Sequence, residues 1–136
     1  MYEMPIERGK IREFAQATHS DNPAFHGDQP LTPPTFLTTA MMAWEPDGET
    51  GINDLGFELA QVLHGEEQYT FPGPPPRAGQ TLTVTSRVGD RYEKEGRRGG
   101  VMRFATVVHE FHDAAGTLVA EQRTTVVETA AAPEVS

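Results

Sequence analysis

Cysteine is absent from this chain of 136 residues, which excludes disulfide bonds, thiolate metal sites and a cysteine nucleophile. Long hydrophobic runs are absent too, so the sequence predicts no membrane-spanning helix. The first residues, MYEMPIERGK, contain no apolar stretch behind their charges and therefore predict no secretory signal. Together these absences predict a protein of the reducing cytoplasm.

Basic residues are few. The chain has 11 Lys and Arg against 20 Asp and Glu, a formal net charge of −9. A phosphate backbone would be repelled by such a surface, so general nucleic-acid binding is not expected. Any anionic ligand must instead be held by a local group of basic side chains.

What is present is typical of one globular domain. Hydrophobic residues make up 37% of the chain, which is enough for a modest core at this length. Residues 7–18, ERGKIREFAQAT, place apolar side chains at helical spacing. After Pro33, a mostly apolar stretch predicts a buried helix of about three turns from about Pro34 to Trp44. The segment EPDGETG ends that helix.

The second half alternates polar and apolar residues, which predicts strands. The alternating segments are residues 66–72, 81–88, 101–112 and 117–127, with a hairpin turn at Asp113–Gly116 and a longer loop, EKEGRRGG, before the third segment. We expect one domain over residues 1–128 and a disordered tail over 129–136. The architecture is therefore α+β, with the apolar helix lying across one face of a curved antiparallel sheet.

The segment THSDNPAFHGD, residues 18–28, is the first candidate site. Asp21 and His26 are five residues apart on a turn, where a carboxylate and an imidazole facing one cleft can polarise water as a general base. The alternative is that Ser20, Asp21 and Asn22 cap the preceding helix and build a turn before Pro23. The sequence favours the turn.

Histidines elsewhere offer weaker candidates. His64 stands beside Gly65 at the start of a strand, where it either lines a pocket or bonds to the backbone. His109 and His112 fall on opposite faces of one strand, since their separation is odd. With no Cys and no His-x-x-x-His spacing, no metal site is expected.

Two further segments suit an anion. The loop containing Arg97 and Arg98 concentrates basic residues, either to meet a phosphate or as a solvated hairpin alternating with glutamates. The prolines of TPPTFLTT place the N–H groups of Thr35 and Phe36 at a helix start. Free N–H groups there would bind a thioester oxygen or another developing anion.

Taken in order, these segments resemble the MaoC-like (R)-specific enoyl-thioester hydratases and dehydratases, and most closely their amino-terminal, non-catalytic-type half. The resemblance covers residues 5–128. Its marks are GKIREFAQAT…DNPAF, PPTF, VLHGEEQYTF, RAGQTLTVTSRV, YEKEGRRGG and DAAGTLVAEQRTTVV. It implies a hot-dog fold, in which a curved antiparallel sheet wraps around a central helix.

The catalytic half of that family carries a motif of the form G-D-x-N-P-x-H, whose Asp and His activate water. Aligned on Asn22-Pro23, this chain has Ser20 at the motif's Asp and Phe25 at its His. Asp21 and His26 keep the motif's spacing but are displaced by one residue. The resemblance therefore predicts that the segment is the remnant of a catalytic site.

The resemblance also implies a role and a partner. Such halves pair with a catalytic MaoC-like hot-dog subunit, as a heterodimer or heterotetramer, and shape the pocket for the acyl chain of a CoA or acyl-carrier-protein thioester. No further cofactor is implied. Thr35, Phe36, His64, Gly65, Arg97 and Arg98 are the predicted substrate-binding residues. Two alternatives stay open: a self-sufficient homodimeric hydratase that uses Asp21 and His26, and a non-catalytic acyl-thioester-binding module.

Overall fold

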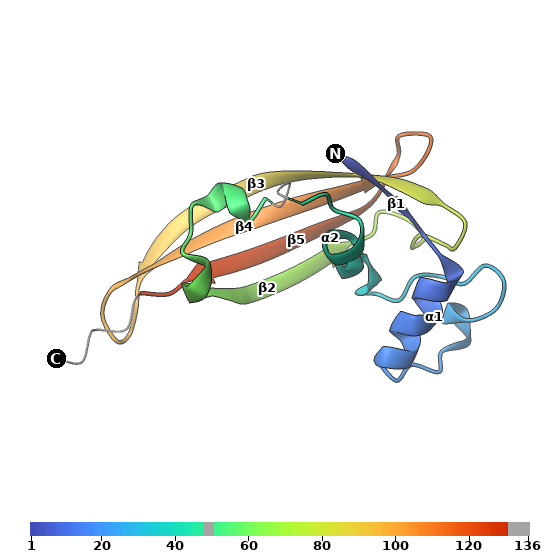
Figure 1. Cartoon of the computed structure of the whole chain (residues 1–136), viewed down its shortest axis with the longest axis horizontal. Coiled ribbons are helices and arrows are strands. Elements are labelled where there is room, and N and C mark those ends of the chain that lie inside the picture. The colour runs from blue at the N-terminus through green and yellow to red at the C-terminus, as the bar shows by residue number, and fades with distance from the viewer. Residues whose placement is uncertain (48–50, 131–136) are drawn as a thin grey trace.

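One antiparallel sheet with short helices on one side makes up the chain in its computed structural model, which describes residues 1–47 and 51–130 (Figure 1). The strands lie in the order β1-β3-β4-β5-β2, and their bounds are β1 Tyr2–Pro5, β2 Val62–Thr70, β3 Thr81–Glu95, β4 Val101–His112 and β5 Leu118–Glu128. The α-helices are α1 Arg8–Ala17 and α2 Thr39–Ala43. The 3-10 turns are η1 Pro23–Phe25, η2 Phe36–Thr38, η3 Asn53–Leu55 and η4 Leu59–Gln61. The α+β class predicted from the sequence is confirmed.

Alternation located the later strands well. The predicted strand 101–112 is β4, and the hairpin turn at residues 113–116 closes with a Gly116 N–H bond to the Asp113 carbonyl. Two strands are longer than predicted. The strand predicted at 66–72 begins earlier, at Val62, and the strand predicted at 81–88 continues to Glu95. The predicted tail lies mostly in residues 131–136, outside the described residues.

The predicted three-turn helix from Pro34 to Trp44 is wrong in length. The structure has the single turn η2 followed by the five-residue α2. Threonine is a weak helix former because its side chain is branched and competes for backbone bonds, and the Thr39 hydroxyl donates to the Phe36 carbonyl at 2.9 Å. At the other end, the N–H groups of Trp44 and Glu45 both donate to the Ala40 carbonyl, and the chain leaves the helix there.

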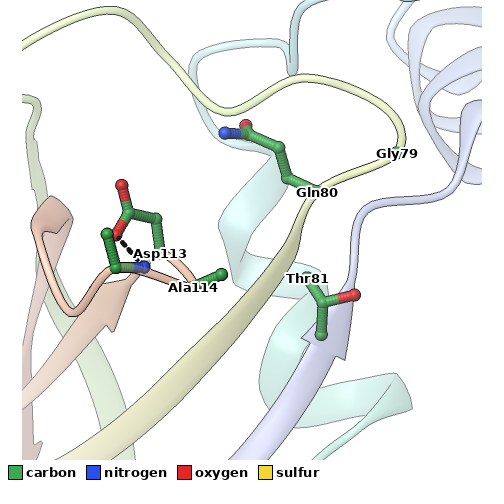
Figure 2. Close-up of a pocket in the computed structure, with 6 residues that line it drawn as sticks. Gly79, Gln80, Thr81, Asp113 and Ala114 are labelled. Carbon is green, nitrogen blue, oxygen red and sulfur yellow. Dashed lines mark hydrogen bonds between the residues drawn. The ribbon is translucent and has the colours of Figure 1, made fainter.

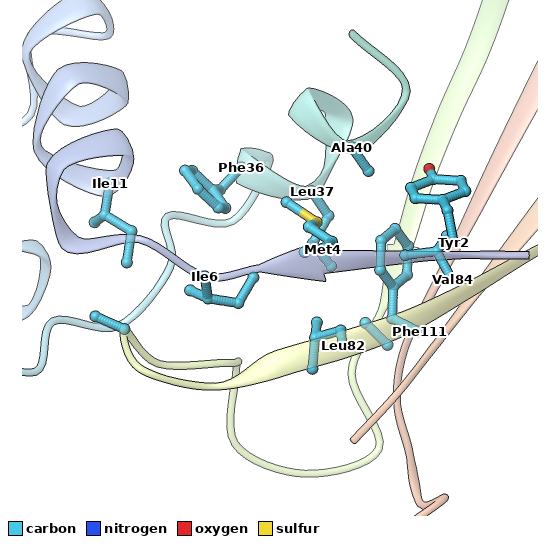
Figure 3. Packing of buried hydrophobic residues seen from close by; sticks show 12 residues of the cluster. Tyr2, Met4, Ile6, Ile11, Phe36, Leu37, Ala40, Leu82, Val84 and Phe111 are labelled. Carbon is cyan, nitrogen blue, oxygen red and sulfur yellow. The ribbon is translucent and has the colours of Figure 1, made fainter. Parts of the chain in front are cut away.

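The core consists of two clusters on one face of the sheet. In the first, η2 and α2 pack with α1 and β1 against β3 and β4, as Figure 3 shows for Phe36, Leu37 and Phe111. In the second, residues 52–57 cover Ala105, Val107 and Val126. Burying each large apolar side chain contributes about 1.5–3 kcal/mol. The face is therefore covered by two segments, where the sequence predicted one helix.

A partly buried ion pair holds the end of the sheet nearer the C-terminus. Arg103 Nε lies 2.6 Å from a carboxylate oxygen of Glu128, across β4 and β5. The Glu58 N–H also donates to this carboxylate. The Glu58 N–H and the Arg103 guanidinium lower the pKa of Glu128. This pair ties the segment before η4 to the sheet.

None of the helices in the described part of the chain has the length and apolar character needed to cross a membrane.

Candidate functional site

A row of polar side chains crosses the helix-covered face of the sheet between the two apolar clusters. Ser86 faces His109, His109 faces Gln122, and Gln122 faces Tyr69 across the four strands β3, β4, β5 and β2. Directly opposed residues of antiparallel strands point to the same side. In the row on one side, Val84, Phe111 and Ala120 belong to the first cluster; on the other side, Val107 and, one row further, Val126 belong to the second. We call Ser86, His109, Gln122, Tyr69, Glu67 and His64 the polar seam.

Glu67 on β2 is the residue that joins the polar seam together. One of its carboxylate oxygens accepts a hydrogen bond from Gln122 Nε2, and the other lies 2.7 Å from His64 Nε2. Tyr69 bonds both to Glu67 and to Thr38 of η2. Burial raises the pKa of Tyr69 to about 12, the bond from Thr38 opposes the rise, and Glu67 adds to it. The phenol therefore stays protonated and can donate.

His64 lies at the open edge of the polar seam, because β2 is the last strand of the sheet. Its side chain is 59% exposed, while that of Glu67 is only 21% exposed. The pairing with β5 shifts register between His64 and Glu66. Such a bulge re-aims side chains and is common beside active sites. A Cβ on Gly65 would lie 3.0 Å from Val127 Cγ2 and 3.3 Å from the Thr125 carbonyl, which explains the glycine at this bulge.

His109 lies buried inside the polar seam, between Ser86 and Gln122. The residue is 4% exposed, and its Nδ1 lies 2.6 Å from Ser86 Oγ. Burial lowers the pKa of His109, while the nearby Glu67 carboxylate acts in the opposite direction. The imidazole is therefore kept neutral and hydrogen-bonded. Chemically, the polar seam offers a carboxylate–imidazole pair at its edge, a phenol donor, and a neutral imidazole inside.

Residues 18–28 form a capped turn at the surface. The Asn22 side chain accepts a bond from the Ala24 N–H at 3.0 Å and so caps η1, while Ser20 Oγ accepts from the Asn22 N–H at 3.4 Å. Asp21 and His26, on either side of η1, are both exposed. Phe25, at the position of the family motif's His, packs partly against the first core cluster.

The N–H groups predicted to be free before the central helix are not both free. The Phe36 N–H donates to the Pro33 carbonyl at 3.0 Å, because Pro33 to Phe36 forms a turn. The Phe36 side chain is 1% exposed and belongs to the core. Thr35 is exposed at the surface of the same turn.

Arg97 and Arg98 lie at the turn between β3 and β4, and both are exposed. The turn is tight, with the Gly96 N–H bonded to the Gly100 carbonyl, because β3 extends as far as Glu95. Figure 1 shows this turn at the opposite end of the molecule from α1. The structure of the chain thus brings neither arginine next to residues 18–28.

A surface hollow of about 500 Å³ lies where the chain enters β3, beside the β4–β5 turn (Figure 2). Its one acidic group, Asp113, accepts bonds from the N–H groups of Ala115 and Thr117, both at 2.9 Å. The carboxylate thus holds the turn together. None of the site residues predicted from the sequence lines this hollow.

Glu67, His109 and Gln122 were missed as site residues. The available signal was that residues two apart on a strand share one face. His109 shares a face with the apolar Val107 and Phe111, and Gln122 shares a face with Ala120 and Thr124. A polar residue among buried positions needs a hydrogen-bonding partner. The partner across the sheet could not be named without knowing the order of the strands. In the described ranges, 1–47 and 51–130, no three His, Asp or Glu side chains gather as metal ligands.

Known protein sequences resemble this chain over most of its length. Residues 2–122 match the family model described as the FAS1-like, dehydratase domain region. A UPF0336 protein of Streptomyces coelicolor is 33% identical over 138 residues, covering 93% of this chain and 85% of that protein. A UPF0336 protein of Parafrankia is 32% identical over 147 residues, covering 96% of this chain and 89% of that protein.

Solved structures share the fold. A MaoC-like dehydratase superposes with a TM-score of 0.76 at 24% identity, covering 96% of this chain and 40% of that one. A chain of the HadBC (3R-hydroxyacyl-ACP dehydratase) complex of Mycobacterium tuberculosis superposes with a TM-score of 0.72 at 21% identity. The match covers 92% of this chain and 89% of that one. A chain of the ChsH1-ChsH2 complex of the same organism superposes with a TM-score of 0.66 at 17% identity. The match covers 96% of this chain and 83% of that one. The predicted hot-dog fold is thereby confirmed.

Proposed function

The chain belongs to the FAS1-like dehydratase family, with UPF0336 proteins as its relatives, and on that premise we propose that it is a non-catalytic subunit of an (R)-specific enoyl-thioester hydratase. In this role it lines the acyl-thioester pocket beside a catalytic MaoC-like hot-dog partner. The reaction of the complex is the reversible addition of water to a trans-2-enoyl thioester, which yields a (3R)-hydroxyacyl thioester. The acyl group is carried by CoA or by the phosphopantetheine arm of a carrier protein.

The observation that carries the proposal is that residues 18–28 lack the Asp and the His at the positions where the family motif has them. The positions that correspond to the motif's Asp and His hold Ser20 and Phe25. Neither side chain can act as an acid–base group at neutral pH. The side chains of Asn22 and Ser20 bond within the turn, and Phe25 packs against the core. The segment therefore supports the fold, and the Asp and His that activate water come from the partner.

The polar seam is what this chain offers to such a complex. His64 and Glu67 lie on the edge strand β2, whose outer side has no neighbouring strand among the residues that the structure describes. An edge strand with unpaired backbone groups is usually covered in the assembled protein. A partner placed along β2 would enclose His64, and Tyr69 with its link to Thr38 would lie behind it. This agrees with a substrate-facing role for His64 and Gly65. A homodimer can form through the same edge when the partner is missing.

The names of two structural neighbours support a two-chain assembly. The HadBC and ChsH1-ChsH2 structures are described as complexes. Each of those complexes contains a chain that shares the fold of this one. The proposal extends this arrangement to the present chain.

The direct test of the missing catalytic pair is the rate of crotonyl-CoA hydration by the purified chain. We expect a rate at or near background, because losing a positioned acid–base pair costs roughly 10²- to 10⁴-fold. Asp21→Asn and His26→Ala should then leave the rate unchanged. Robust turnover that either substitution abolishes would establish a self-sufficient hydratase that uses the displaced pair.

A further inference from the structure

A second hollow, of about 580 Å³, lies between α1 and the loop that follows η1. Its lining residues come from two consecutive turns of the helix and from the loop: Arg8, Gly9, Arg12, Gln16, Phe25, His26, Gly27 and Asp28. We call it the α1 hollow. Helix α1 lies at the end of the molecule opposite the turn between β3 and β4 (Figure 1).

The α1 hollow is locally basic on an acidic protein. Arg8 and Arg12 are one helical turn apart and project on the same face of α1. Arg12 has no ion-pair partner among the described residues. Arg8 lies 3.4 Å from Asp28, but both side chains are strongly exposed, so the pair is weak. Two guanidinium groups and His26 thus face the single carboxylate of Asp28, against a net charge of −9 for the chain.

Gly9, the second residue of α1, lines the α1 hollow without a side chain. A Cβ at Gly9 would meet nothing within 4 Å, so no packing contact in the described chain requires glycine there. Gly27 across the hollow is also open, and its φ of +94° lets the loop turn away from the helix. A glycine beside basic side chains permits close approach of a ligand to the backbone.

From this arrangement we propose that the α1 hollow binds a phosphate group, with Arg8, Arg12 and His26 as its donors. Guanidinium groups bind phosphate through paired, charge-assisted hydrogen bonds. Two ligands share this chemistry: the adenosine 3′,5′-bisphosphate end of CoA, and the phosphodiester of a phosphopantetheine arm. The proposal rests on the proposed function only for this choice of carriers. Phosphate recognition itself does not depend on a partner subunit.

Calorimetric titration of the purified chain at low salt tests the site with two probes, adenosine 3′,5′-bisphosphate and 4′-phosphopantetheine. We expect at least one to bind, and the tighter one identifies the carrier. Arg12→Gln should weaken binding about three- to tenfold and reduce its salt dependence. The matched control is Lys10→Gln, which removes the same charge from the same helix. Lys10 pairs with Glu13 at 3.1 Å and does not line the hollow, so affinity should change less than twofold.

Two more variants test the shape of the α1 hollow and the sign of its charge. Gly9→Gln should fill the hollow and abolish binding while it keeps the charge and favours the helix, so folding is preserved. Asp28→Asn should strengthen binding, because it removes the one negative charge and releases Arg8.

Three outcomes would overturn the proposal. They are binding of neither probe, equal losses in Arg12→Gln and Lys10→Gln, and loss of binding in Arg97→Ala/Arg98→Ala with none in Arg12→Gln. The last would place the phosphate at the β3–β4 turn. Because neither probe carries an acyl group, each result can be read separately from any hydratase assay.

Discussion

His64 and Glu67 face each other across the bulge in β2, with His64 Nε2 2.7 Å from a carboxylate oxygen of Glu67. The same carboxylate accepts a bond from Gln122, which is only 2% exposed. The pair therefore joins a buried side chain to an exposed one at the edge of the sheet. A carboxylate held in this way fixes the orientation of the imidazole beside it.

Removing the Glu67 carboxylate should destabilise the fold. Glu67→Ala leaves the buried Gln122 amide without its partner, which costs about 1–3 kcal/mol in the free energy of unfolding. Urea denaturation measures this difference. The matched control is Glu66→Ala on the same strand, an exposed residue whose loss should change the value by less than about 0.5 kcal/mol. Equal effects of the two substitutions would show that the polar seam has no role in stability.

The buried His109 should make stability depend on pH. Its pKa in the folded chain is lowered by burial from the ordinary value of about 6.5. Below pH 6.5 the unfolded chain takes up a proton here and the folded chain does not, so unfolding is favoured. The contribution of His109 is thus complete above pH 6.5 and is lost as the pH falls through the lower pKa of the folded state.

Urea midpoints measured from pH 7.5 to 5.5 test this. They should fall less steeply in His109→Asn than in the parent chain, because the titrating group is gone. His19→Asn, at an exposed residue whose backbone asparagine tolerates, should keep the parent slope. An unchanged slope in His109→Asn would contradict the account. If that variant unfolds, an NMR titration of the parent chain should still show His109 protonating below the ordinary histidine value of about 6.5.

Gly65 should tolerate no larger side chain. A branched side chain in Gly65→Val would press on Val127 and on the Thr125 carbonyl, and we expect a loss of about 1–3 kcal/mol in the free energy of unfolding. Gly73→Val is the control, because nothing lies within 4 Å of a Cβ at Gly73. Thermal or urea unfolding of both variants decides the question. A loss at Gly73 as large as that at Gly65 would argue against a packing cause.

The sequence predicted strands where residue types alternate along the chain, and failed where they do not. β4 was predicted with correct bounds because Met102, Phe104, Thr106 and Val108 fall on one side of the strand. The end of β3 was missed because its last residues, RYEKE, are exposed and charged although they pair with β4. There the strand is held by backbone pairing with the other strand of the hairpin. The sequence therefore shows no alternation of apolar residues from which the strand could be predicted.

β1 was missed for a different reason. Its four residues are too few for a periodic signal, although Tyr2 and Met4 alternate on the core side. The central helix was overestimated because TFLTTAMMAW is mostly apolar, and an apolar run does not indicate where a helix ends. Bonds of Thr39, Trp44 and Glu45 to earlier carbonyls set its length, and these depend on the folded backbone.

The candidate site was only half accessible to sequence reasoning. His64 and Gly65 were identified from their place before an alternating strand, and they do lie together at the bulge of β2. Ser86, His109 and Gln122 of the polar seam lie on three more strands, and Gln122 is 55 residues from Glu67 in the sequence. Strand order brings them together, and strand order is set by packing across the whole sheet.

The central claim is that this chain completes a catalytic hot-dog partner, and co-expression tests it most directly. The partner is a MaoC-like chain with an intact G-D-x-N-P-x-H motif from the same organism. Size-exclusion chromatography and an enoyl-CoA hydration assay are then applied to each chain alone and to both together. We expect the chains to elute as one complex, with an interface above roughly 1,000 Å², and hydration to require the partner's Asp and His and to rise on adding this chain. Separate elution with unchanged activity on mixing would contradict the claim and leave a stand-alone acyl-thioester-binding module.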